Sequence, residues 1–176
     1  MKVVVISGSP RKTANTQIIM QEIYDYAKSK NKDIKFINLS KSKIDCYEGP
    51  DGNYSDNTKQ ATKDIIEADV WFIGTPVYNS FFSSSLKNLF EYVNYKETEG
   101  KIAGLAILAS GNISFIAVQT YLTQLMSYFH VITNPKALFM TVNMLKDGKV
   151  ADDEAKIRIR ELVDNTLALA SKRDSS

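Results

Sequence analysis

The residue types on which metal centres and disulfide scaffolds depend are scarce in this chain. Its 176 residues include one cysteine, Cys46, and one histidine, His130. A single cysteine excludes an intrachain disulfide and any zinc or iron–sulfur centre built from several cysteines, and a single histidine argues against a histidine-rich metal site. We therefore expect no metal, and we interpret Cys46 as a plain reduced thiol and His130 as a structural or surface residue.

Blocks of like charge and long hydrophobic runs are also absent. The 22 lysines and arginines nearly balance the 20 aspartates and glutamates, so the formal charge is +2 and the chain lacks the basic footprint of a nucleic-acid-binding protein. The apolar run at residues 3–7 is too short for a signal peptide or a membrane span. We expect a cytoplasmic protein with neither nucleic acid nor membrane as a partner.

The composition is that of an ordinary globular chain. Hydrophobic residues make up 44% and charged residues 24% of the sequence. A chain of this length buries roughly 70% of its unfolded surface, which is enough for a sheet covered on both faces. We predict one domain over residues 1–176.

Short apolar runs alternate with stretches of helical periodicity along the chain. The run at residues 70–74 is nearly continuous, which is typical of a strand buried on both faces. Strands are expected at residues 3–7, 34–39, 70–74 and 102–108 and within residues 137–142. Helices are expected at residues 18–30, 56–68, 86–93, 115–129 and 152–173, with Asp56 or Asn57 capping the second of them.

This alternation predicts an α/β fold. Each connection is long enough for a right-handed crossover, so we expect a three-layer, doubly wound, five-stranded parallel sheet with strand order 2-1-3-4-5. The helix at residues 115–129 is apolar on more than one side. It therefore needs cover beyond the sheet, and we expect a second subunit to cover it in a homodimer or homotetramer.

Residues 8–16, Gly-Ser-Pro-Arg-Lys-Thr-Ala-Asn-Thr, form the first strand-to-helix connection. Such a turn directs free N–H groups and the positive end of the helix dipole to the sheet edge, where they favour an anion. Gly8 permits a tight backbone path, and Arg11 brings a planar charged fork suited to phosphate oxygens. An ordinary tight connection with a polar cap is the alternative. The candidate phosphate ligands are Ser9, Arg11, Asn15 and Thr16.

Two further loops are expected to meet the first one. In a doubly wound sheet, ligands bind beyond the carboxyl ends of the strands where the strand order reverses, which here is between the first and third strands. Residues 75–82 and 109–112 lie at this edge, and the three loops together suit the phosphate, polar chain and flat ring of FMN. Each loop taken alone also fits a plain turn or strand end. The candidate ring contacts, with main-chain groups of residues 77–79 among them, are Pro76, Val77, Tyr78, Asn79, Ser110, Gly111 and Asn112.

Other phosphate-binding motifs do not match the first loop. The Walker A motif requires Gly-Lys-Ser/Thr before its helix, and the dinucleotide fingerprint requires three spaced glycines where this chain has only Gly8. A phosphatase of similar topology would need a nucleophilic cysteine in the first loop, whereas Cys46 follows the second strand. These three readings are therefore excluded.

Together, these residues resemble the NADPH-dependent FMN reductases and related quinone or azo-compound reductases of the flavodoxin-like fold. The resemblance lies in Gly-Ser-Pro-Arg at residues 8–11 with Asn-Thr at 15–16, in Gly-Thr-Pro-Val-Tyr-Asn at 74–79 followed by Ser-Leu-Lys-Asn at 85–88, and in Gly-Lys at 100–101 leading to Ala-Ser-Gly at 109–111. It implies that the first motif holds the FMN phosphate and that the other two loops hold the ring. Iron–sulfur relatives use several cysteines after the second strand, so the single Cys46 excludes that branch.

The resemblance implies an NAD(P)H-dependent FMN reductase. We therefore expect hydride to pass from NADPH or NADH to flavin N5 and the reduced flavin then to leave or to pass electrons to a second acceptor, so that no side chain has to act as acid or base. A quinone, azo-compound or nitro-compound reductase is the alternative on the same scaffold. A flavodoxin-like electron carrier is a further alternative, against which the pI near 8.5 argues, and a non-catalytic flavin sensor is another.

Overall fold

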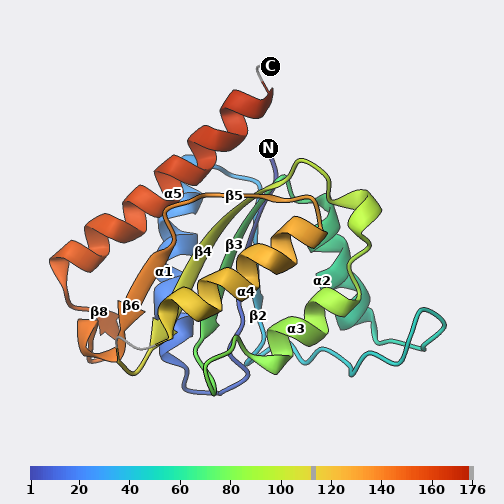
Figure 1. Cartoon of the computed structure of the whole chain (residues 1–176), viewed down its shortest axis with the longest axis horizontal. Coiled ribbons are helices and arrows are strands. Elements are labelled where there is room, and N and C mark those ends of the chain that lie inside the picture. The colour runs from blue at the N-terminus through green and yellow to red at the C-terminus, as the bar shows by residue number, and fades with distance from the viewer. Residues whose placement is uncertain (112–113, 175–176) are drawn as a thin grey trace.

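The computed structural model describes residues 1–111 and 114–174. Its central sheet has the order β2-β1-β3-β4-β5 with every pair parallel, which confirms the predicted doubly wound α/β fold (Figure 1). The strands of this sheet are β1 (Val3–Ser7), β2 (Ile34–Asn38), β3 (Val70–Pro76), β4 (Ile102–Ala109), β5 (Ile132–Thr133) and β6 (Leu138–Thr141).

The last position in the sheet is occupied by two short strands rather than one. β5 pairs with the start of β4, and β6, which confirms the strand predicted within residues 137–142, pairs with its end. Between them the chain passes through Asn134 and Pro135, and proline has no N–H to donate to a ladder. The Asn134 side chain turns inward and donates to the Thr166 hydroxyl at 3.0 Å, so this interruption is fixed to the C-terminal helix.

Helices cover both faces of the sheet. β1 shows how the strands serve both faces, because Val3 and Val5 join the core under α1 and α5 whereas Val4 and Ile6 join the core under α2, α3 and α4. Among the described residues, no helix has the length and hydrophobicity needed to cross a bilayer. The helices are α1 (Asn15–Lys30), α2 (Asp56–Glu67), α3 (Ser84–Glu91), α4 (Phe115–Tyr128) and α5 (Asp153–Asp174), with short 3-10 turns at η1 (Tyr95–Glu97) and η2 (Val142–Met144).

A small hairpin that the sequence pattern did not predict precedes α5. It consists of β7 (Leu145–Lys146) and β8 (Lys149–Val150), paired antiparallel, and β8 lies against α1 (Figure 1). Asp147 and Gly148 form its two-residue loop with φ of 51° and 73°, as in the type I′ turns that favour glycine. The turn predicted at these two residues is therefore the tip of a hairpin.

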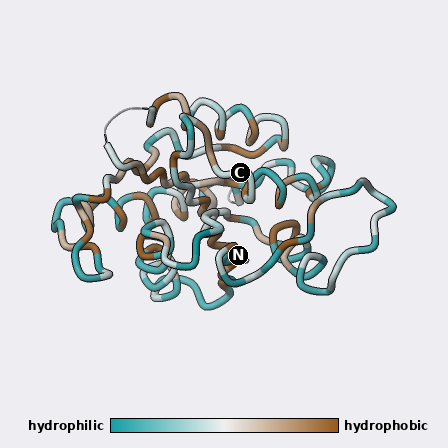
Figure 2. The backbone as a smooth tube through the Cα atoms, turned by 90° about the horizontal axis from the view of Figure 1, so that it is seen from below, coloured by the Kyte–Doolittle hydropathy of each residue, from teal (hydrophilic) through white to brown (hydrophobic). Residues whose placement is uncertain are grey.

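The long connection before α2 is tied to the body of the protein, although it projects from one side (Figures 1 and 2). The Asp45 carboxylate accepts hydrogen bonds from the Ser55 N–H at 2.7 Å and the Thr58 hydroxyl at 2.8 Å. Hydrogen bonds from Ser55 and Thr58 hold the pKa of Asp45 below its usual value. They also fix Ser55 as the N-cap of α2, so the prediction of Asp56 or Asn57 as the cap was wrong by one or two residues.

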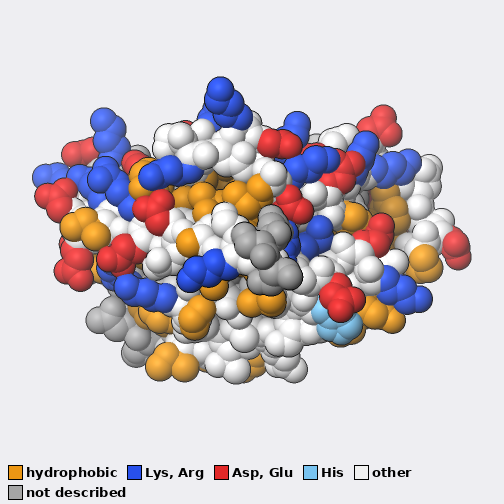
Figure 3. All heavy atoms as spheres, turned by 90° about the horizontal axis from the view of Figure 1, so that it is seen from above, with side chains coloured by type: hydrophobic (Ala, Val, Ile, Leu, Met, Phe, Trp, Pro, Cys, Tyr) orange, Lys and Arg blue, Asp and Glu red, His pale blue; other side chains and the backbone are white. Residues whose placement is uncertain are grey.

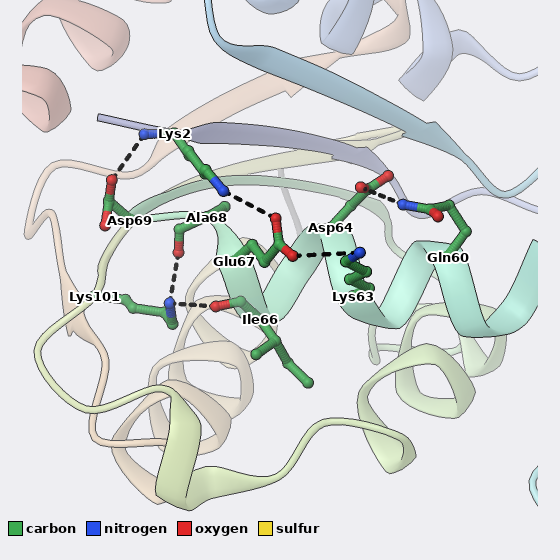
Figure 4. Close-up of polar contacts among 9 residues, drawn as sticks. All are labelled: Lys2, Gln60, Lys63, Asp64, Ile66, Glu67, Ala68, Asp69 and Lys101. Atoms are coloured by element: carbon green, nitrogen blue, oxygen red, sulfur yellow. Dashed lines mark hydrogen bonds and ion pairs between the residues drawn. The ribbon is translucent and has the colours of Figure 1, made fainter.

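The amino ends of the strands carry a mixed-charge network. The Lys2 ammonium pairs with Glu67 at 2.9 Å, and the Lys2 backbone N–H donates to Asp69 at 2.7 Å (Figure 4). Half-buried Lys101 donates to the carbonyls of Ile66 and Ala68 at the end of α2, and burial lowers its pKa. Figure 3, which looks onto this edge, shows acidic and basic side chains intermixed. This edge therefore anchors α2 and shows no broad surface of one charge.

Candidate functional site

The carboxyl ends of β1, β3 and β4 lie at the lower edge in Figure 1, and Figure 2 looks onto this edge. The loops that follow these strands border a cavity of about 280 Å³. Its wall is made of Ser9, Arg11, Thr13, Ala14, Asn15, Thr16, Pro76, Val77, Tyr78, Leu108, Ala109, Ser110 and Val142. The three loops that the sequence placed together therefore do form one cavity.

Most of the predicted ligand residues line this cavity, but two do not. Asn79 and Gly111 are absent from its wall, and Asn112 lies outside the described residues. The residues that line the cavity and were not among the predicted ligands are Thr13, Ala14, Leu108, Ala109 and Val142. The predicted residues that line it are Ser9, Arg11, Asn15, Thr16, Pro76, Val77, Tyr78 and Ser110.

The first loop is held close to its neighbours from both sides. The Gly8 N–H donates to the Gly74 carbonyl at 2.8 Å, and the buried Ser83 hydroxyl donates to the Gly8 carbonyl. A Cβ atom at Gly8 would lie only 2.7 Å from the Gly74 oxygen. Next to it, the Ser9 and Tyr78 hydroxyls are hydrogen-bonded at 3.3 Å, so the first loop and the second loop meet directly at the cavity wall.

The N-terminus of α1 has the features of an anion site. In the part of the chain that the structure describes, no side chain caps it, and its first turn contains no acidic residue. The start of α4 is likewise uncapped among the described residues, whereas Ser55 caps α2, Ser83 caps α3, and Asp152 accepts from the Ala155 N–H at the start of α5. Of the two uncapped helices, α1 is the one whose first residues line the cavity. Helix N–H groups without an internal partner need one from elsewhere, and a phosphate supplies both acceptors and negative charge. The N–H groups at the start of α1 and the side chains of Ser9, Arg11, Asn15 and Thr16 fit the phosphate of FMN.

A tight turn shapes the second loop. Tyr78 and Phe81 exchange two backbone hydrogen bonds of 2.9 Å, and the two residues between them, Asn79 and Ser80, have φ of 48° and 62°. This turn takes Asn79 out of the cavity wall. The Val77 N–H donates to the Leu108 carbonyl at 2.8 Å. Since the N–H groups of Val77 and Tyr78 are both engaged, these residues can offer a ring only carbonyl oxygens and side chains.

The cavity wall lacks the usual groups for acid–base catalysis. Among the described residues that line it there is no aspartate, glutamate, histidine or lysine, and its one tyrosine, Tyr78, is hydrogen-bonded to Ser9. Lys87 pairs with Glu91 instead of lining the cavity, and Cys46 is an exposed thiol that does not line it. The arrangement is suited to holding and orienting a group that brings its own chemistry.

The sequence pattern of the NADPH-dependent FMN reductases matches residues 1–145 of this chain. The chain belongs to the NADPH-dependent FMN reductase family. As a member of this family, it is an oxidoreductase whose cofactors are FMN and a reduced nicotinamide nucleotide, in agreement with the sequence prediction.

Relatives of the FMN reductase family extend this similarity over most of the chain. The chain is 23% identical to the NAD(P)H-dependent FAD/FMN reductase of Geobacillus thermodenitrificans, over 92% of this chain and 89% of the relative. It is 26% identical to the NADPH azoreductase of a Bacillus species, over 97% of this chain and 93% of the relative. Among solved structures, the NAD(P)H:(acceptor) oxidoreductase FerB of Paracoccus denitrificans superposes with a TM-score of 0.79 at 20% identity, covering 98% of each chain. The last similarity establishes the shared fold.

Proposed function

We propose that the cavity at the carboxyl edge of the sheet holds FMN and that the protein uses it to reduce a small acceptor with electrons from NAD(P)H. The supporting observation is that three loops, from β1, β3 and β4, form one cavity beside the uncapped N-terminus of α1. In this proposal Ser9, Arg11, Asn15 and Thr16 bind the phosphate. Residues 76–78 and Ser110 border the ring. Asn79 and Gly111 are not in the cavity wall, and Asn112 lies outside the described residues.

The protein contributes to the reaction by positioning the flavin. FMN, when bound by these residues, would supply the redox chemistry between the nicotinamide and the acceptor. Tyr78 is oriented by its hydrogen bond to Ser9, which fixes the wall against which the ring would lie. The cavity is small enough to leave part of a bound flavin uncovered, and NAD(P)H and the acceptor need access to that part in turn. Double-reciprocal plots of initial rates should therefore be parallel, as for ping-pong kinetics.

Steady-state oxidation of NADH and NADPH by the purified protein, with and without added FMN, tests this function. We expect FMN-dependent oxidation by the isolated protein. Oxidation that requires a separate reductase would instead indicate an electron carrier, and tight FMN binding without turnover would indicate a sensor.

The acceptor is the second part of the proposal. The family similarity favours free flavin, and the similarity to a relative named NADPH azoreductase supports an azo compound or a quinone as the alternative. A panel of FMN, a benzoquinone and an azo dye at equal concentration ranks them by kcat/KM. We expect the highest value with FMN, and a higher value with the dye or quinone would assign the alternative.

We also propose that the protein forms a homo-oligomer through α4. This helix buries Val118, Leu122 and Met126 against the sheet, yet Ile116 is 77% exposed and Tyr128 62% exposed on its outer side. Phe81, from the loop after β3, packs against Tyr121 with the ring centroids 4.4 Å apart and the ring planes tilted by 31°, and it extends this apolar surface. An apolar surface of this kind indicates a protein contact.

Sedimentation of two variants tests the oligomer. Ile116→Glu places a charge in the proposed contact and should shift the protein to monomers. Ile157→Glu, at a 55% exposed position of α5, should leave the oligomer intact. A monomeric wild-type protein, or equal behaviour of both variants, would refute the contact at α4.

A further inference from the structure

A separate cavity lies between α2 and the chain at the end of α3. It measures about 520 Å³, within the range of about 300–1,000 Å³ that is usual for small-molecule sites. Its wall is formed by residues of α2 between positions 58 and 67, by Tyr54 from the connection before α2, and by Tyr92 and Glu97. None of these described residues lines the proposed flavin cavity, so the proposed function gives this cavity no role.

Two tyrosine rings form the aromatic side of the cavity. Tyr54 and Tyr92 pack edge to face, with the ring centroids 4.8 Å apart and the ring planes at 85°. The Tyr54 hydroxyl donates to the Gly49 carbonyl at 2.6 Å, and the Tyr92 hydroxyl donates to the Asp45 carbonyl at 2.8 Å. Because these bonds already hold both rings, a ligand would gain aromatic contact without the cost of ordering them.

The α2 side of the cavity combines an apolar side chain with two cations. Ile66 is half-buried and lines the wall. The hydroxyls of Thr58 and Thr62 both donate within the protein, at 2.8 and 2.9 Å. The side-chain donors that α2 can offer a ligand are therefore the ammonium groups of Lys59 and Lys63, which lie one turn apart on the same side of the helix.

The two carboxylates in the wall have cations of their own. Glu67 pairs with Lys2 at 2.9 Å and with Lys63 at 3.7 Å, and Figure 4 shows one ammonium group at each of its oxygens. Glu97 lies close to half-buried Lys101, because burial lowers the pKa of Lys101 and Glu97 partly offsets this effect. These two carboxylates are therefore not available to neutralise the remaining cation of the wall.

That remaining cation is Lys59. It is exposed, and it forms none of the ion pairs found among the described residues. An anion placed at its ammonium group would gain a charge-assisted hydrogen bond. The same ligand would bury a flat apolar body against the tyrosine rings and Ile66.

We propose that this cavity binds a planar aromatic anion, such as an aryl carboxylate or an aryl sulfonate. The ring lies against Tyr54 and Tyr92, and the acidic group lies at Lys59. The site is independent of the proposed flavin site, because the two cavities have no described wall residue in common.

Calorimetric titration with naphthalenesulfonate and with uncharged naphthol, at neutral pH, tests the site. The two probes share a ring system and differ in charge, so the sulfonate should bind the wild-type protein about tenfold more tightly. Lys59→Gln should weaken sulfonate binding by about five- to tenfold and leave naphthol binding unchanged. Lys96→Gln is the matched control, since Lys96 is an exposed lysine next to Glu97 that does not line the cavity. It should change neither affinity.

A variant that fills the cavity supplies a second test. Thr62 is half-buried in the wall, and Thr62→Phe would place a ring in the space that the probe needs while keeping both lysines. It should abolish binding of both probes, with a cooperative urea transition as the evidence that the variant is folded. Undiminished binding to the folded variant would overturn the proposal.

Other results would also overturn the site. Equal affinities of the two probes, or equal effects of Lys59→Gln and Lys96→Gln, would show that Lys59 does not bind the acidic group. A loss of sulfonate binding in Arg11→Ala, with Lys59→Gln unaffected, would assign the probe to the flavin cavity. If neither probe binds the wild-type protein, this proposal fails and the proposed function stands.

Discussion

At Gly8 the backbone of the first loop runs so close to β3 that a side chain has no room. An added methyl group would lie 2.7 Å from the Gly74 carbonyl oxygen and 3.2 Å from the Leu86 Cβ. Gly8→Ala should therefore lower the free energy of unfolding by about 1–3 kcal/mol, the usual cost of overpacking, as measured in urea. Gly111→Ala is the control, since its methyl would meet no described atom within 4 Å. Equal stability of Gly8→Ala and the wild-type protein would contradict this reading.

Arg11 is the charged side chain in the wall of the proposed phosphate site. Arg11→Ala should weaken FMN binding by about 1.5–3 kcal/mol, the range for a hydrogen bond to a charged group. Lys12→Ala removes the neighbouring charge, which does not line the cavity, and should have a much smaller effect. Titration calorimetry compares the three proteins. Unchanged FMN affinity in Arg11→Ala would show that the phosphate binds at another part of the molecule.

The sequence predicted which residues line the cavity more accurately in regular helices and strands than in tight turns of the main chain. Asn15 and Thr16 open a helix that was recognised by its periodicity, and both line the cavity. Asn79 was predicted as a ring contact because it follows Tyr78, but it sits in a type I′-like turn. The Asn-Ser pair lacks the glycine that usually marks such a turn, so the sequence did not reveal it.

At the level of elements, Ser83 connects α3 to the first loop. Its hydroxyl accepts from the Leu86 N–H at 3.1 Å and donates to the Gly8 carbonyl. Ser83→Ala should cost about 1–2 kcal/mol of stability through the lost cap and should also weaken FMN binding, because the loop loses an anchor. Ser84→Ala, at the exposed neighbouring position, should change neither. Lost stability with unchanged FMN affinity would show that the cap does not support the proposed phosphate site.

Tyr92 ties α3 to the long connection before α2, since its hydroxyl donates to the Asp45 carbonyl at 2.8 Å. Burial raises the pKa of Tyr92 from 10.0 to about 12. A pKa raised in the folded state means that its stabilising contribution is complete below about pH 10 and is lost between about pH 10 and 12. Urea unfolding across this range should show a steeper loss of stability for the wild-type protein and for Tyr128→Phe than for Tyr92→Phe. An equal loss of stability with pH in all three proteins would contradict the raised pKa of Tyr92.

Long apolar strands and helices with a regular stripe were predictable, and short elements were not. The runs that became β1, β3 and β4 are nearly continuous in apolar residues and end close to the expected positions. β5, β7 and β8 contain two residues each, which is too few to show any period. Their formation depends on neighbours far away in the sequence, so no local pattern indicates them.

For the molecule as a whole, the strand order determines where the site lies. Because β1 is next to β3 and β3 is next to β4, the loops after these three strands meet at one edge. That edge was predictable from the alternation of elements. The sequence did not predict that Val142 lines the cavity or that residues 145–150 form a hairpin, because both depend on how the chain returns from β6 to α5.

The measurement that tests the central claim most directly is the visible spectrum of the FMN-loaded protein before and after anaerobic addition of NADPH or NADH. The wild-type protein should retain FMN through gel filtration or, if the flavin is exchanged as a substrate, should bind it measurably in titration. In either case the flavin absorption should bleach on addition of the nicotinamide and return with air. A protein that binds no FMN and leaves both nicotinamides unoxidised in its presence would contradict the proposed flavin site.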